Sequence, residues 1–113
     1  MTVLNQGLNA YRDLIRAAIA TVEIGTGTTP ETGADTALKS PLASKSATTF
    51  NRLTGEFVVR GRLGAAEGNG SYLSEVGIKT ATTLTTRKTH AALLKTNLIE
   101  VEYEILVRLR NKT

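Results

Sequence analysis

The sequence predicts an α+β chain, mainly β, in which an N-terminal amphipathic helix precedes an antiparallel β-sandwich or rolled sheet of about six strands. Three observations lead to this prediction. Apolar residues recur at helical spacing near the N-terminus. Apolar and charged residues alternate through residues 99–109, with Leu106 as the exception, and threonine, which favours strands and turns, occurs 18 times. At 113 residues the chain is expected to form a single domain, 1–113, with one modest core.

The helix is expected to lie within residues 1–20 and to be firmest over residues 5–20. Its apolar stripe consists of residues spaced by four, three, four and four positions: Leu4, Leu8, Tyr11, Ile15 and Ile19. Such a stripe must be covered by other apolar groups. Packing on the chain's own sheet is the simpler expectation, and packing on a neighbouring molecule is the alternative.

The β module is expected over residues 21–113 and begins with a short β-branched strand, residues 21–24. The strand leads into a long loop, residues 25–41, which is rich in Gly, Thr, Pro, Asp and Ser. Loops of this length are commonly functional or docked on the domain. We expect Leu38 and Leu42 to anchor this loop in the core and Asp35 to begin a short helical turn.

Two further strands are expected to form a hairpin. Residues 43–51 are polar and Thr-rich, as is typical of an exposed edge strand, and a turn at 52–55 separates them from the alternating residues 56–63. The alternation predicts one buried and one exposed face. The buried set is Phe57, Val59 and Leu63, and the exposed set is Glu56, Arg60 and Arg62.

A second loop, residues 64–71, contains Gly68-Asn69-Gly70, which suits positive φ angles. Residues 72–79 predict a strand with Val76 and Ile78 inward, and residues 82–88 a weaker strand. Residues 99–109 alternate for about eleven positions, which predicts a long, half-buried antiparallel strand.

Residue types that carry catalysis and metal binding are scarce. The chain has no cysteine and one histidine, His90, which is expected between two strands without a functional role. The run at residues 25–29 lacks the Gly-Lys-[Ser/Thr] of a phosphate loop. Glu67 and Glu75 have no nearby catalytic partner in the sequence, and we expect Glu75 to pair with an arginine of the strand at 56–63. We therefore expect no enzyme, no cofactor and no metal.

The net charge of +4 permits a nucleic-acid partner. The densest positive features are Arg87-Lys88 and the terminal Arg108, Arg110 and Lys112. The face that carries Arg108 and Arg110 also carries three glutamates, which repel phosphate, and it lacks aromatic stacking platforms. A small basic nucleic-acid-binding module is therefore the alternative function. Only 4% of the residues are aromatic, which disfavours a glycan-binding or hydrolytic domain.

No apolar run reaches the roughly 18 residues that a membrane helix needs, so no membrane partner is expected. The polar residues near the N-terminus likewise argue against a secretory signal.

Four short segments occur in a recognisable order. Residues 22–30 read VEIGTGTTP, residues 35–38 read DTAL, residues 68–70 read GNG and residues 75–78 read EVGI. In this order the chain, from about residue 22 to its end, resembles structural proteins of tailed bacteriophages, which carry IGTGTT-P, DTAL and GNG…REVGL. The resemblance implies a β-rich, non-enzymatic virion component of the tail fibre, collar or baseplate kind. No collagen-like or coiled-coil shaft follows the β module, so an adaptor, anchor or decoration protein is expected.

A virion component of this kind is made in the host cytoplasm, and it would contact copies of itself with cyclic symmetry as well as other virion proteins. The candidate surfaces are the helix stripe, the loop at 25–41 and the last strand, whose edge could pair with a neighbour. The candidate interface residues are Leu8, Tyr11, Ile15, Ile19, Thr26, Thr28, Leu38, Tyr103, Ile105, Arg108 and Arg110.

Overall fold

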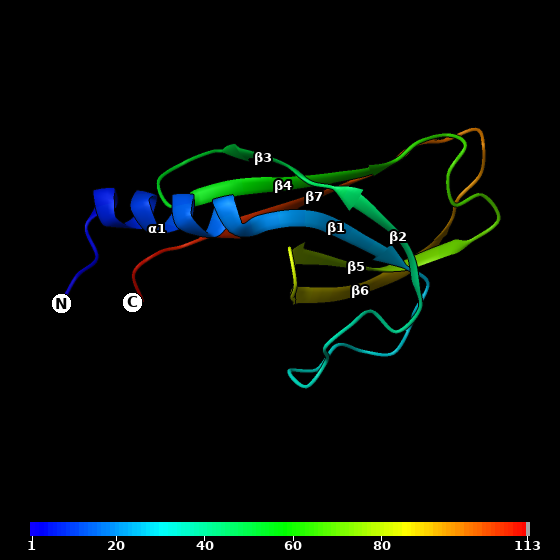
Figure 1. Cartoon of the computed structure of the whole chain (residues 1–113), viewed down its shortest axis with the longest axis horizontal. Helices are drawn as coiled ribbons and strands as arrows, with labels where there is room; N and C mark the ends of the chain where they lie inside the picture. Colours follow the sequence, from blue (N-terminus) through cyan, green and yellow to red (C-terminus); the bar gives the residue numbers. More distant parts are fainter. Residues whose placement is uncertain (113) are drawn as a thin grey trace.

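Two antiparallel sheets pack face to face in the computed structural model, which describes residues 1–112 (Figure 1). The elements in chain order are α1 (Asn5–Ala18), β1 (Ile19–Gly25), β2 (Pro41–Ser46), β3 (Thr48–Asn51), β4 (Glu56–Leu63), β5 (Tyr72–Thr80), β6 (Leu84–Leu94) and β7 (Val101–Arg108). One sheet has the order β2-β1-β5-β6 and the other β3-β4-β7. The predicted α+β, mainly β class and the sandwich are confirmed.

The described part of the chain has seven strands because the expected edge strand over residues 43–51 divides between the sheets. β2 pairs with β1, whereas β3 pairs with β4 in the predicted hairpin. The chain crosses at Ala47, whose N–H donates to the carbonyl of Ala20 at 3.1 Å and whose side chain packs against the core. This crossing closes one side of the sandwich.

The core lies between the inner faces of the sheets. Its buried members are Val22, Ile24, Phe57, Val59, Leu63, Leu73, Val76, Ile78 and Val101. The inward placement predicted for β4 and β5 is therefore confirmed for their apolar residues. Glu56, which was expected to be exposed, is instead buried. Its carboxylate contacts Arg52 at 3.2 Å and Arg108 at 2.7 Å, and these two cations compensate for its burial.

β6 differs most from expectation, because it continues to Leu94 and places His90 on a strand instead of between two strands. Its second half pairs with β5 after a register shift between Leu73 and Glu75. Residues 90–94 lack β-branched side chains, so their strand conformation comes from pairing with β5 and not from local propensity.

α1 ends at Ala18, and the chain passes into β1 without a linker, since Ile19 already has extended angles (φ −71°, ψ 128°). The helix therefore projects beyond one end of the sandwich, beside the β3–β4 turn and the C-terminal segment (Figure 1). Polar bonds fix it there. Asn9 Oδ1 accepts the Gly55 N–H at 2.9 Å, and Arg16 Nη1 donates to Asn51 Oδ1 at 2.9 Å.

Gly61 offers a test of the packing between the sheets. A methyl group at this position would come within 2.5 Å of Val22 Cβ on the opposite sheet. We expect Gly61→Ala to lower the free energy of unfolding by about 1–3 kcal/mol, because an overpacked core forces side chains or backbone to move. Urea denaturation measures the change. Gly33→Ala is the control, since no atom lies within 4 Å of the added methyl group. Equal losses in the two variants would contradict the packing.

Candidate assembly interface

The loop between β1 and β2 lies over the outer face of the four-stranded sheet, where the fully buried carboxylate of Glu75 holds it. Oε2 of Glu75 accepts the backbone N–H groups of Gly27 and Ser40, both at 2.8 Å. Oε1 accepts the N–H of Lys39 at 3.0 Å and Nε of Arg87 at 2.9 Å. A single carboxylate thus satisfies both ends of the loop.

Arg87 extends this cluster across the loop. Its Nη1 donates to Asp35 at 3.0 Å and its Nη2 to the carbonyl of Thr29 at 2.7 Å. The expected partnership of Glu75 with Arg60 or Arg62 is therefore wrong. Those two arginines lie on β4, in the other sheet, whereas Arg87 lies on β6 directly beside β5.

Hydrogen bonds keep the carboxylates of this cluster ionised. Burial alone raises the pKa of Glu75, but the donors from Ser40, Lys39, Arg87 and Gly27 outweigh it and hold that pKa below its ordinary value. The N–H of Thr32, followed by Lys39, lowers the pKa of Asp35 to about 2.

The loop itself differs in two details from expectation. Leu38 is buried and comes close to Gly77 of β5, so it is an anchor as predicted, but Leu42 is exposed and is not an anchor. Residues 26–40 contain no helical turn; Asp35 instead accepts the N–H of Thr32 at 3.0 Å and closes a turn. The anchoring uses the outer face of the sheet, so the loop forms a partial third layer.

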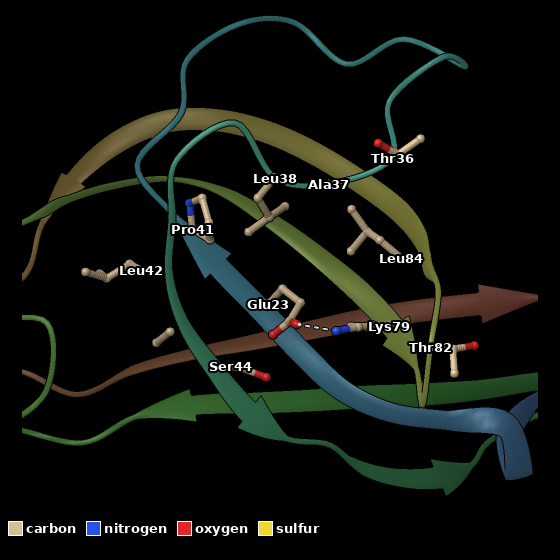
Figure 2. Close-up of a pocket in the computed structure, with 11 residues that line it drawn as sticks. Glu23, Thr36, Ala37, Leu38, Pro41, Leu42, Ser44, Lys79, Thr82 and Leu84 are labelled. Carbon is tan, nitrogen blue, oxygen red and sulfur yellow. Dashed lines mark ion pairs between the residues drawn. The ribbon is translucent and has the colours of Figure 1, made fainter.

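A depression of about 380 Å³ lies between this loop and the sheet (Figure 2). Leu38 and Leu84 line it, and Glu23 and Lys79 face each other in it at 3.8 Å. Oε2 of Glu23 is buried and has no hydrogen-bond partner among the described residues. The site can accept a small apolar group. The ion pair between Glu23 and Lys79 does not by itself form a set of catalytic residues.

The apolar stripe of α1 is divided between the body and solvent. Leu8 is buried and Ile19 packs against the core, whereas Leu4, Tyr11 and Ile15 face solvent. The expectation that the stripe packs on its own sheet is therefore wrong for these three. The exposed fractions are 61% for Leu4, 55% for Tyr11, 71% for Leu14 and 40% for Ile15. The side of the helix that meets the body instead carries the polar anchors Asn9 and Arg16 together with the buried Leu8. Several large apolar groups on one helix face form a patch of the kind that marks an interaction site.

A second uncovered apolar surface is the cleft between β6 and β7, with a volume of about 730 Å³. Its lining includes Ile105, Leu106 and Val107 of β7 and Val76 and Ile78 of β5. His90 and Tyr103 link the two strands by a hydrogen bond of 2.8 Å. In the strand order β3-β4-β7, β7 is an edge strand of its sheet.

The structure divides the predicted interface residues into separate groups. Tyr11 and Ile15 lie on the exposed helix face, and Tyr103 and Ile105 line the cleft together with Arg108. Thr28 and Arg110 are exposed. The others are used within the chain: Leu8 and Leu38 are buried, Ile19 packs against the core, and the N–H of Thr26 donates to Ser40.

Of the expected basic features, Arg87, Lys88 and Arg108 are engaged by carboxylates. Two arginines of β4 are paired as well. Arg60 contacts Glu102 and Glu104, both at 2.7 Å, and Arg62 contacts Glu100 at 3.4 Å. Arg87 is buried beneath the β1–β2 loop, where it pairs with Glu75 and Asp35. The strand face is thus a ladder of alternating charges, which offers phosphate no continuous positive track.

Sequence reasoning missed Lys95, which directly follows β6 and is fully buried. Its Nζ donates to Asn69 Oδ1 at 2.9 Å and to the carbonyl of Thr96 at 2.8 Å, so it holds the β4–β5 and β6–β7 connections together. A lone lysine in a leucine-rich segment gave no signal of this role.

Within residues 1–112, no group of three or more His, Asp or Glu side chains is arranged to hold a metal ion. The one helix of this part of the chain is too short to span a membrane. The sequence matches no protein-family model and no curated protein sequence. The geometry and the sequence pattern therefore carry the functional argument.

Glu75→Gln tests the role of the buried carboxylate. All four groups that contact Glu75 are donors, so the NH₂ of a glutamine faces two of them in either orientation. We expect a loss of about 3 kcal/mol in the free energy of unfolding, as for a broken buried ion pair. The control Glu100→Gln removes an exposed partner of Arg62 and should cost under about 0.5 kcal/mol. Similar urea midpoints for both variants would refute the anchoring.

Acid is expected to weaken the same loop. Bonds from Thr89 lower the pKa of Glu31 from 4.5 to about 2, and the pKa of Asp35 falls from 3.8 to about 2. Since the folded pKa values lie below the unfolded ones, this stabilisation is present above about pH 5 and is lost as the pH falls toward 2. Urea midpoints should therefore drop over this range, and less steeply in Thr89→Val. A midpoint that does not change with pH would contradict this linkage.

Proposed function

We propose that this chain is a non-enzymatic structural component of a bacteriophage virion, an adaptor, anchor or decoration protein of the tail, collar or capsid. It works by assembling with copies of itself and with other virion proteins. The outward apolar face of α1 is the observation that carries the assembly part of this proposal. The virion part rests on the ordered segments IGTGTTP, DTAL, GNG and EVGI.

The physical argument for assembly concerns the free energy of exposed apolar surface. Each large side chain removed from water contributes about 1.5–3 kcal/mol relative to full exposure. Leu4, Tyr11, Leu14 and Ile15 are roughly half exposed, so covering them offers a substantial part of the free energy that a stable contact needs. The bonds from Asn9 and Arg16 fix the helix with this face outward, so little ordering is required on binding.

The alternative, a basic nucleic-acid-binding module, has less support. Arg60, Arg62 and Arg108 are each paired with glutamates. A phosphate backbone would have to displace these carboxylates or meet them at close range, and either costs electrostatic free energy.

The solution mass of the purified chain tests self-assembly. We expect light scattering on a sizing column to show one discrete oligomer that persists from low to high salt, because burial of apolar surface does not weaken as salt screens charges. Nucleic-acid binding, by contrast, weakens steeply between about 50 and 200 mM salt. A chain that stays monomeric at its highest soluble concentration but binds DNA or RNA at low salt would favour the alternative function.

A further inference from the structure

We propose that α1 of one copy inserts its apolar face into the β6–β7 cleft of the next copy, so that the chain assembles head to tail. This inference rests on the proposed self-assembly and names the two surfaces that meet. Because the two surfaces differ, such a contact is heterologous, and it closes into a ring or continues as a helical array.

The cleft exists because the two sheets have unequal numbers of strands. The four-stranded sheet ends in β6, whereas the three-stranded sheet ends in β7, which pairs with β4 on one side and with no strand of the described residues on the other. Thr86 and Lys88 pair with Ile78 and Val76, so they share the inner face of the sheet. They nevertheless remain exposed. Among the described residues, the three-stranded sheet therefore has no strand to cover the inner face of β6.

The helix has the dimensions of the missing cover. From Leu4 to Ile15 its stripe rises about 17 Å, at about 1.5 Å per residue. The stretch of β7 that lines the cleft, from Tyr103 to Arg108, extends about 17 Å at about 3.3 Å per residue. A helix is about 10 Å across, which equals the usual distance between packed sheets. Helix-in-groove docking with anchors one turn apart is a common recognition mode.

The charged groups beside both surfaces are already paired within the chain. Asp13, beside the apolar stripe, contacts Arg12 at 3.0 Å. At the rim of the cleft, Lys88 contacts Glu31 at 3.3 Å and Arg108 contacts Glu56 at 2.7 Å. The contact therefore rests on the burial of apolar surface and should persist as salt screens charges.

The helix cannot fill the cleft of its own chain. It continues into β1 without a linker, and Val3 and Asn111 exchange two hydrogen bonds, of 2.9 and 3.0 Å, that tie its N-terminal end to the C-terminal segment. Movement into its own cleft would break these bonds and those of Asn9 and Arg16. The occupant that carries the matching apolar face is therefore a second copy.

Two charge-changing variants test the contact. Leu14→Glu alters the helix face, and Lys88→Glu alters the cleft at an exposed side chain that shares the inner face with Val76, so neither replaces a core residue. We expect each variant alone to be a monomer of 12.1 kDa. An equimolar mixture should give a species of twice that mass and nothing larger, because Lys88→Glu keeps an intact helix and Leu14→Glu keeps an intact cleft.

Leu98→Glu, on the exposed β6–β7 connection, is the matched control and should assemble like the wild type. Circular dichroism melts verify that each variant is folded, and Thr86→Glu, at another exposed residue of the cleft, replaces Lys88→Glu if the latter is not. Wild-type assembly that the cleft variants leave intact, or a mixture that stays monomeric, would overturn the docking while self-assembly stands. A wild type that is itself monomeric at every soluble concentration would overturn both proposals.

Discussion

The buried carboxylate of Glu75 is the interaction on which the outer layer of this structure depends. It lies on the outer face of β5 and collects donors from both ends of the β1–β2 loop and from Arg87 on β6. A charge buried in this way is costly unless every oxygen is satisfied, and here each oxygen has two donors. These hydrogen bonds therefore fix the conformation of the β1–β2 loop. In this conformation Leu38 lies over Gly77 and the loop covers the outer face of the sheet.

The sandwich is closed on one side and open on the other. The crossing at Ala47 carries the chain from β2 to β3 and seals the first side. On the other side, His90 of β6 and Tyr103 of β7 form a hydrogen bond across the cleft between these strands. The helix at the end of the molecule adds a second uncovered surface, because its direct continuity with β1 places it beyond the core. The fold thus leaves one convex and one concave apolar surface, on parts of the chain that cannot reach each other.

The charges of the chain are distributed differently from what the composition suggests. A net charge of +4 indicates a basic protein, yet Arg60 and Arg62 are paired with glutamates of the β7 segment, and Arg87 is buried under the loop. Alternating charges on an edge of this kind also discourage uncontrolled strand pairing with other molecules. A directed contact through a helix and a cleft is compatible with that protection, whereas an open pairing of edges is not.

The sequence by itself determined the elements, since period and turn chemistry are local properties. The stripe of Leu4, Tyr11 and Ile15 predicted the helix, Gly68 and Gly70 predicted a turn with positive φ, and the alternation at residues 99–109 predicted the last strand. Only the tertiary structure decided where these elements point. Whether the helix stripe is covered depends on the linkerless junction at Ile19, and the partner of Glu75 depends on β6 lying next to β5. These choices arise from contacts between residues far apart in the chain, which leave no periodic signal in the sequence.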